Sequence, residues 1–285
     1  MKLAVNSVLQ NTSQRMDLRW CLIIMKRLLP YFLILLISCE DNDLGLESNP
    51  IDSKIIIEAR EVLEPNSRRL NLFCRTEKIY PCVNYPIIAD EEIDANSFKI
   101  TFTEVGETVL CLTAFGPATV VIDLNSVANG EYEIELNNAK LRNKGTLKVT
   151  DTDISFQFGK RNGIDFIRTT TMRVPNNTYW GTIGYHVASS STLVDEFIQK
   201  FVDAGANFGE QLPGHYFYYE IDNAGDIVTN AENSGYYFMR NFIFQYDGDE
   251  TELEQIVEVE GKNFKEALSI RLSTYEGETF YNWGD

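Results

Sequence analysis

Apolar and polar residues alternate along short runs in the first half of the chain. The pattern is clearest in residues 131–136, where Tyr132, Ile134 and Leu136 fall on one side and three glutamates on the other. A period of two is typical of a β-strand with one buried and one solvated face. Strands at this spacing predict an antiparallel β-sandwich over residues 55–160. The runs lie at residues 55–63, 69–75, 79–88, 98–104, 109–113, 118–124, 131–136, 145–150 and 154–158.

The second half combines one helical pattern with aromatic runs. Residues 192–204 place their apolar side chains on one face and their charged side chains on the other, which predicts an amphipathic helix. Ser191 or Thr192 is expected to cap its first amides, and Gly205 to end it. A small α+β domain, with this helix on an antiparallel sheet, is expected over residues 164–285. Its strands are predicted at residues 215–221, 236–246, 256–259 and 267–274.

A signal-like segment precedes the predicted sandwich. Met25-Lys26-Arg27 is followed by the uncharged run 28–37, which is too short for a membrane-spanning helix of about 20 residues. The run ends in Leu36-Ile37-Ser38-Cys39, which resembles the lipobox of bacterial lipoprotein signal peptides. The resemblance implies cleavage before Cys39 and a diacylglyceryl group on its thiol. Because earlier charged residues make a poor signal head, Met25 is an alternative start to Met1.

The resemblance also sets the expected organisation and location. Residues 1–38 are predicted to be a leader and signal peptide, residues 39–54 an acidic tether, and residues 55–160 and 164–285 the two domains of a mainly β protein. The lipid on Cys39 implies anchoring to the outer membrane of a bacterial cell envelope, either in the periplasm or on the surface. Acidic residues directly after Cys39 are similar to the export signals that some lineages use for surface lipoproteins.

The segment around Tyr132 carries a second resemblance. Residues 123–134 are similar to the corner before a late strand in immunoglobulin-like and fibronectin-like sandwiches. The resemblance implies that the Tyr132 hydroxyl bonds back to the preceding loop. Tyr132 is therefore expected to be a packing residue, and the first domain to be immunoglobulin-like.

Charge and cysteine content narrow the classes of partner. The formal net charge is −17, and the densest basic stretch, Lys140 to Lys144, is too short for a nucleic-acid footprint. No nucleic-acid partner is expected. Once Cys21 is removed with the leader and Cys39 carries lipid, Cys74, Cys82 and Cys111 remain of the five cysteines, and they allow three different single disulfides, all compatible with an oxidising compartment.

Catalytic and metal-binding motifs are missing from the sequence. His186 and His215 lie far apart on predicted strands, with no HExxH pair, GxSxG elbow or EF-hand loop. Acidic runs such as residues 90–94 and 247–250 are interpreted as solvated loops. No cofactor or metal is expected, and an enzyme is the less favoured class, although a spatially assembled site leaves no sequence motif.

The aromatic runs provide the candidate binding residues. Tyr216, Phe217, Tyr218 and Tyr219 would place rings on both faces of a strand, and only one face can cover the helix. The other face is either a platform for a sugar or protein partner or a core against the first domain, Trp180 and Trp283. The expected function is a glycan- or protein-binding module of the envelope. The alternatives are an envelope hydrolase and a structural assembly subunit, and the oligomeric state is open.

Overall fold

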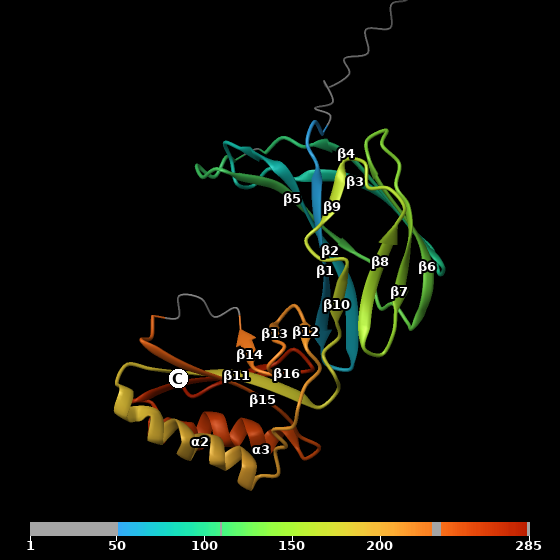
Figure 1. Ribbon diagram of the computed structural model, residues 1–285. Helices are drawn as coiled ribbons and strands as arrows, with labels where there is room; N and C mark the ends of the chain where they lie inside the picture. The colour runs from blue at the N-terminus through green and yellow to red at the C-terminus, as the bar shows by residue number, and fades with distance from the viewer. Residues whose placement is uncertain (1–50, 109, 230–234, 284–285) are drawn as a thin grey trace, which may run out of the picture. The chain divides into compact units, whose positions relative to one another are not determined.

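The computed structural model describes residues 51–283, apart from residue 109 and residues 230–234 (Figure 1). The predicted leader, the lipobox with Cys39 and most of the tether lie outside the described residues. Within those residues the fold is mainly β, with several largely antiparallel sheets and few helices, which confirms the predicted fold class. No helix in this part of the chain has the length and hydrophobicity to cross a membrane.

Two sheets contain the strands of the first half. One has the order β5-β2-β1-β9 and the other the order β10-β8-β7-β6-β4-β3. Most neighbours are antiparallel, but β1 pairs with β9 and β4 with β6 in parallel. The strands are β1 (Ile55–Glu64), β2 (Ser67–Tyr80), β3 (Ile87–Ile93), β4 (Ser97–Val105), β5 (Gly116–Asp123), β6 (Gly130–Asn138), β7 (Lys144–Val149), β8 (Asp153–Phe158), β9 (Ile164–Phe166) and β10 (Thr170–Met172).

The core of this half lies where the two sheets face each other. Burial alternates strictly along β1, so that Ile55 and Ile57 are buried while Ile56 and Glu58 are partly exposed. Phe102 on β4 and Leu136 on β6 join the same buried cluster. The alternation that predicts these strands therefore also selects their inner face. Tyr132 donates a 2.8 Å hydrogen bond to the carbonyl of Ala128, as its resemblance implies. The immunoglobulin-like assignment itself stays a prediction.

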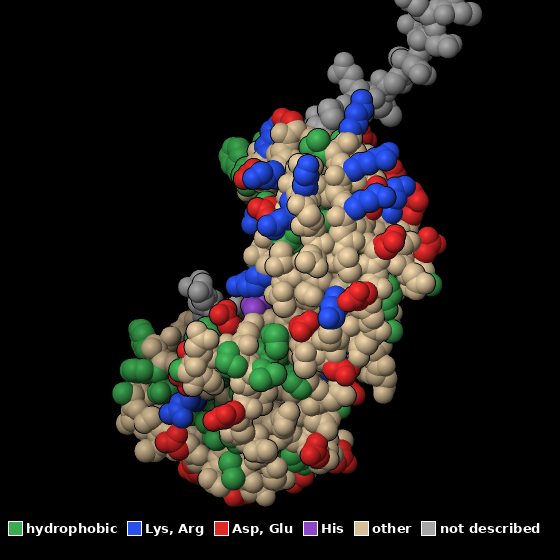
Figure 2. All heavy atoms as spheres, turned by 45° about the vertical axis from the view of Figure 1, so that its right-hand side comes forward, with side chains coloured by type: hydrophobic (Ala, Val, Ile, Leu, Met, Phe, Trp, Pro, Cys, Tyr) green, Lys and Arg blue, Asp and Glu red, His purple; other side chains and the backbone are tan. Residues whose placement is uncertain are grey.

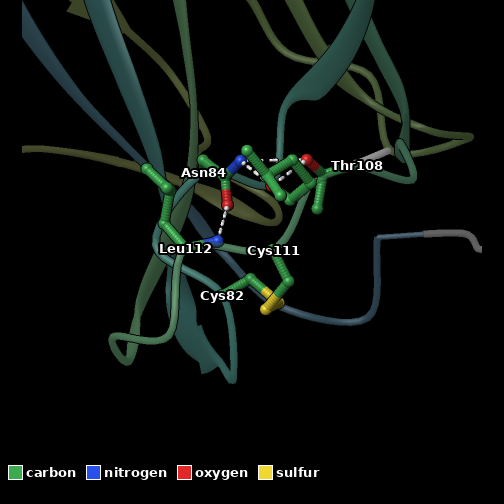
Figure 3. Close-up of a disulfide and its surroundings, with 6 residues drawn as sticks. Cys82, Asn84, Thr108, Cys111 and Leu112 are labelled. Carbon is green, nitrogen blue, oxygen red and sulfur yellow. Dashed lines mark hydrogen bonds between the residues drawn. A yellow bond between two sulfur atoms is a disulfide. The ribbon is translucent and has the colours of Figure 1, made fainter.

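Three predicted features of this half differ in the structure. Residues 81–86 leave the strand predicted at 79–88, and residues 110–115 form a loop where a strand was expected at 109–113. The cause is a disulfide between Cys82 and Cys111, with Cα atoms 5.3 Å apart, which joins these two connections (Figure 3). In addition, β9 and β10 pair with β1 and β8, although residues 164–172 were assigned to the second domain.

The second half contains two further sheets and the helices. The larger sheet has the order β15-β11-β16-β17 and the smaller one the order β12-β13-β14. Their strands are β11 (Thr178–Tyr185), β12 (Gly214–His215), β13 (Tyr219–Ile221), β14 (Ile227–Thr229), β15 (Phe238–Gln245), β16 (Leu268–Thr274) and β17 (Thr279–Tyr281). The helices are η1 (Ala188–Ser190), α2 (Ser191–Asp203), α3 (Glu250–Glu254), η2 (Gln255–Glu260) and η3 (Gly261–Phe264).

Both α-helices lie along one face of the larger sheet (Figure 1). Val194, Phe197 and Phe201 of α2 are buried against the sheet, which confirms the predicted apolar stripe. The predicted cap at Ser191 or Thr192 is wrong, because Ser190 is the N-cap residue and its side chain makes no capping bond. The short helix η1 leads directly into α2 at this point. The strand predicted at 256–259 is also wrong. These residues are helical, and their buried members Ile256 and Val257 are adjacent rather than alternating.

Two arginines tie the connection between the halves to β1. Arg173 bonds through Nε to Oε1 of the buried Glu61 at 2.8 Å, and its Nη1 donates to the carbonyl of Thr150 at 2.8 Å. Arg68 lies 3.4 Å from the other carboxylate oxygen of Glu61 and also donates to the carbonyl of Val174. A buried carboxylate needs such charged partners, so Glu61 fixes the path of residues 173–174.

Candidate functional site

The larger sheet of the second half has a face that the helices do not cover. Alternation along β11 directs Tyr179 and Ile183 toward the helices and Trp180 and Thr182 to the opposite face. On the neighbouring strand β16, register places Arg271 opposite Thr182 and Ser273 opposite Trp180. This open face therefore carries a tryptophan beside hydroxyl and guanidinium groups.

The predicted aromatic strand at residues 215–221 is a tight hairpin instead. The strand breaks between β12 and β13, where Phe217 has a positive φ of 68° and the Tyr216 amide bonds to the carbonyl of Tyr219 at 2.9 Å. A bulky residue rarely adopts this conformation. Tyr216 and Tyr219 therefore do not lie on opposite faces, as an extended strand requires. Their rings stack 4.8 Å apart, and both are buried.

The four predicted binding residues thus divide into two pairs. Tyr216 and Tyr219 belong to a core with Trp180, whose ring lies 5.2 Å from that of Tyr219, so the core alternative describes where they lie. Phe217 and Tyr218 are at the hairpin tip and are partly exposed. Only this second pair can contact a ligand without unfolding the hairpin.

Phe217 and Tyr218 close one side of a pocket of about 250 Å³ on the open face. We call it the ring pocket. Its walls are aromatic on one side and polar on the other, as in sites that orient a small ligand. The residues that line it are Trp180, Gly181, Thr182, Phe217, Tyr218, Thr229, Arg271 and Ser273.

Arg271 supplies the positive charge of the ring pocket. Its side chain is exposed and makes no ion pair or side-chain hydrogen bond with any described residue. Register places it beside Tyr281 of β17, whose ring lies 4.8 Å from that of Trp283. A guanidinium can bind a carboxylate with two parallel hydrogen bonds, so Arg271 is suited to an anionic group on a ligand.

The polar wall is held in place by a hydrogen-bond network. Asn241 on β15 accepts a 3.2 Å bond from Thr182 and a 3.0 Å bond from Thr229 through the same side-chain oxygen. Its amide nitrogen donates to the carbonyl of Ile227 at 3.4 Å. The two threonines are therefore oriented by the larger sheet and by β14 together. Their hydroxyl oxygens retain acceptor capacity toward the pocket.

The aromatic wall is fixed by contacts with β1. The Tyr218 hydroxyl donates to the carbonyl of Glu61 at 3.0 Å and accepts from the Leu63 amide at 3.3 Å. Burial raises the pKa of this phenol, so it remains a neutral donor. The guanidinium of Arg60 lies 4.5 Å from the centre of the Phe217 ring. These contacts preorganise Phe217 and Tyr218 even though they sit at a hairpin tip.

The two histidines are not part of the ring pocket. Both ring nitrogens of His215 are buried without a hydrogen-bond partner among the described residues, and a carboxylate oxygen of Glu220 is 3.9 Å from Nδ1. This distance is too long for a hydrogen bond. Burial lowers the pKa of His215, so its imidazole is neutral. His186 packs instead against Tyr236, with ring centres 4.9 Å apart.

No group of three or more acidic, histidine or cysteine side chains in the described part of the chain is arranged to hold a metal ion. Cys74 is a free, buried thiol, and burial raises its pKa far above the ordinary range. It is therefore a packing residue and not a nucleophile.

No protein family, curated protein or solved structure matches the chain.

The polar residues of the ring pocket were not predicted from the sequence. Trp180 is expected only as a possible cover for the tyrosines, and no motif marks Thr182, Arg271 or Ser273. The available signal is the alternation of apolar and polar residues at 268–274, which puts Arg271 and Ser273 on one face of β16, whereas residues 178–185 are buried at all but one position and do not alternate. Their proximity depends on the pairing of β11 with β16, which is a long-range contact.

Proposed function

We propose that the protein is a lipid-anchored binding module of a bacterial cell envelope and that it holds an acidic glycan in the ring pocket. The single observation that carries the glycan proposal is that Phe217 and Tyr218, over the largely buried Trp180, meet in one pocket with Arg271, which has no ion pair among the described residues. Aromatic rings offer broad apolar surface to the C–H face of a sugar, while hydroxyl and guanidinium groups bind its polar edge. A sugar carboxylate would take the place opposite Arg271.

The strong negative charge of the chain does not oppose this assignment. Exposed charges more than about 8 Å apart are largely screened at physiological ionic strength, so the local cation decides what binds in the pocket. The ring pocket is also small, below the range of about 300–1,000 Å³ typical of drug-sized ligands. It therefore suits one sugar ring of a longer glycan better than a whole oligosaccharide.

A protein ligand is the second candidate within the same class. An acidic side chain on an extended peptide would present the same carboxylate to Arg271. The hydrolase alternative has less support, because His215 bonds to neither a serine nor a carboxylate among the described residues.

The test is binding of purified protein to arrays of neutral and uronic-acid-containing oligosaccharides, with acidic peptides on the same surface. Arg271→Ala should weaken binding to the acidic glycan about 10- to 100-fold, because a hydrogen bond to a charged group contributes about 1.5–3 kcal/mol. Arg240→Ala is the matched control. It removes an arginine from the same sheet, but from the helix-covered face, where Arg240 lies 3.4 Å from Asp195.

Three results would contradict the glycan assignment. Equal binding by the parent protein and Arg271→Ala would exclude the pocket as the site. Binding only to acidic peptides would transfer the site to a protein partner. No binding to any surface, with the Arg240→Ala control folded normally, would remove the glycan proposal altogether.

A further inference from the structure

Strands of both sheets begin or end at one end of the sandwich. In the first sheet β1 begins at Ile55, beside β9, and Gly116 of β5 pairs with Tyr80 of β2. In the second sheet the pairs Ile87–Val105 and Gly145–Phe158 stand at the same end. The Asn138 side chain links the two sheets there, donating 2.8 Å bonds to the carbonyls of Ser53 and Gly163. We call this the Ile55 end.

Large apolar side chains project from the Ile55 end. Leu110, Leu112 and Phe115 are 72%, 50% and 82% exposed, and we call these three residues the tip. Isolated exposed apolar residues are ordinary, but three within six positions of one loop form a patch. Such a patch is typical of a surface that meets a partner or a membrane.

The tip is held outward by covalent and polar contacts. Cys111, which lies between Leu110 and Leu112, forms the disulfide with Cys82. The Asn84 side chain bonds to the backbone of both leucines (Figure 3). Its nitrogen donates to the Leu110 carbonyl at 2.6 Å, and its oxygen accepts from the Leu112 amide at 3.1 Å. These contacts hold the backbone of the tip in place, and its apolar side chains do not fold back into the core.

Basic side chains surround the same end. Lys140, Arg142, Lys160 and Arg161 are exposed on the loops 139–143 and 159–163. These loops are joined by a 3.0 Å bond from the Asn143 side chain to the Asn162 carbonyl. Figure 2 shows most of the lysine and arginine side chains of this face gathered over the upper part of the view, with some acidic side chains among them. An apolar tip beside a basic rim is the charge pattern of a surface that meets anionic lipid headgroups.

The described chain also begins at this end. Ile51 is buried, and Asp52 forms an ion pair at 2.9 Å with Lys78 on β2. Lys78 lies only four residues before Cys82 in the sequence. Only eleven residues separate Cys39 from Ile51. Even as a random coil, eleven residues would span no more than about 20 Å on average. A lipid on Cys39 would thus hold the Ile55 end near the bilayer.

We propose that the Ile55 end rests on the membrane surface, with the tip in the interfacial layer and the basic rim against anionic headgroups. This inference rests on the proposed lipid anchor. The acidic remainder of the body is repelled by an anionic membrane, so charge and apolar burial select the same orientation. The tip would thereby give the anchored protein a defined orientation on the membrane.

The experiment uses the full chain, purified from the membranes of producing cells and reconstituted into liposomes of phosphatidylcholine and phosphatidylglycerol with brominated acyl chains. Phe115→Trp adds a fluorophore at the tip, and Tyr237→Trp adds one at an equally exposed ring in the second half. After subtraction of the parent's tryptophan signal, the bromines should quench about half or more of the fluorescence added by Phe115→Trp. They should leave that added by Tyr237→Trp nearly unchanged.

A second set of variants tests the basic rim. In the Phe115→Trp background, Lys140→Gln with Arg142→Gln should reduce quenching in anionic liposomes about twofold. Lys262→Gln, a change at an exposed lysine of η3, should not. Equal quenching of the Phe115→Trp and Tyr237→Trp signals would overturn the proposal, and so would their common lack of quenching. Self-association that shields the tip without quenching would reassign the patch to a second copy of the chain.

Failure of the anchor gives a different result from failure of the tip. Without lipidation the protein would not co-purify with membranes, and mass spectrometry would find no lipid on Cys39. Protein that is lipidated but unquenched at the tip would contradict only the docking inference. Loss of glycan binding through the ring pocket would affect neither measurement.

Discussion

Buried tyrosine hydroxyls at the hairpin differ in whether they have a partner. Tyr218 bonds to two backbone groups of β1, whereas the hydroxyl of Tyr219 is buried and has no hydrogen-bond partner among the described residues. An unsatisfied buried hydroxyl costs free energy, while a satisfied one contributes about 0.5–1.5 kcal/mol. The two neighbours should therefore respond in opposite ways to loss of the same oxygen atom.

Tyr219→Phe should leave the free energy of unfolding unchanged or raise it by up to about 1 kcal/mol, because the ring contacts with Tyr216 and Trp180 remain. Tyr218→Phe should lower it by about 0.5–1.5 kcal/mol, because the Leu63 amide and Glu61 carbonyl lose a partner. Urea melts of both variants measure the difference. A loss of more than 1 kcal/mol in Tyr219→Phe would mean that its hydroxyl has a partner in solution.

The cysteines show what residue types alone leave open. The sequence allows three pairings among Cys74, Cys82 and Cys111, and spacing cannot choose between them. The structure joins Cys82 to Cys111 because both lie in loops at one end of the sandwich, whereas Cys74 points into the core from β2. The choice depends on long-range strand pairing, which local sequence does not encode.

At the scale of elements, the helix α2 tests the packing of the second half. Phe197 contacts Phe201 and Phe264 with ring centres 5.3 Å and 5.5 Å apart, and it is fully buried. Gln199 lies on the opposite face, is exposed, and donates a hydrogen bond to Asp203, one turn further along. The two positions therefore compare burial with exposure within a single turn.

Phe197→Ala should lower the free energy of unfolding by about 3–5 kcal/mol, because it leaves a cavity between the helix and the sheet. Phe201→Ala should behave alike, since its ring packs 5.0 Å from that of Phe244. Gln199→Ala should change stability by less than about 0.5 kcal/mol. Denaturant melts followed by circular dichroism provide the measurement. Similar losses on both faces would show that the helix does not pack through its apolar stripe.

Periodicity predicted the elements that have one wet face and failed where other forces decide. Burial alternates along β1, most of β4 and the first seven residues of β6, and the buried residues of α2 recur with helical spacing, so local sequence was enough. Residues 110–115 are hydrophobic for a reason other than strand formation, because a disulfide and Asn84 hold them outside the sheet. At residues 216–219 a left-handed Phe217 reverses the chain, and β-propensity alone cannot reveal such a turn.

The candidate site was predictable only in part for the same reason. Phe217 and Tyr218 could be chosen from the density of rings, and both line the ring pocket. Arg271 and Thr182 lie about ninety positions apart and meet through the pairing of β16 with β11. Nothing in the local sequence of either strand distinguishes these side chains from ordinary solvated ones.

At the scale of the whole molecule, the proposals place two surfaces on one acidic body. The ring pocket belongs to the second half, and the apolar tip belongs to the Ile55 end of the sandwich. The tip is useful only if the chain is tethered near a bilayer, whereas the pocket can bind its ligand in solution. The anchor would therefore keep both surfaces at the membrane, and it can be tested by itself.

Cys39→Ser should abolish incorporation of radiolabelled palmitate and leave an uncleaved precursor, because only a cysteine thiol at this position can form the thioether that precedes cleavage. Ser38→Ala keeps a small residue before the cysteine and should be processed normally, which makes it the matched control. Mass spectrometry of the amino terminus distinguishes the two. Normal processing of Cys39→Ser would falsify the lipobox interpretation. The ring pocket would then be tested as a site on an unanchored protein, whereas the docking inference, which rests on the anchor, would be withdrawn.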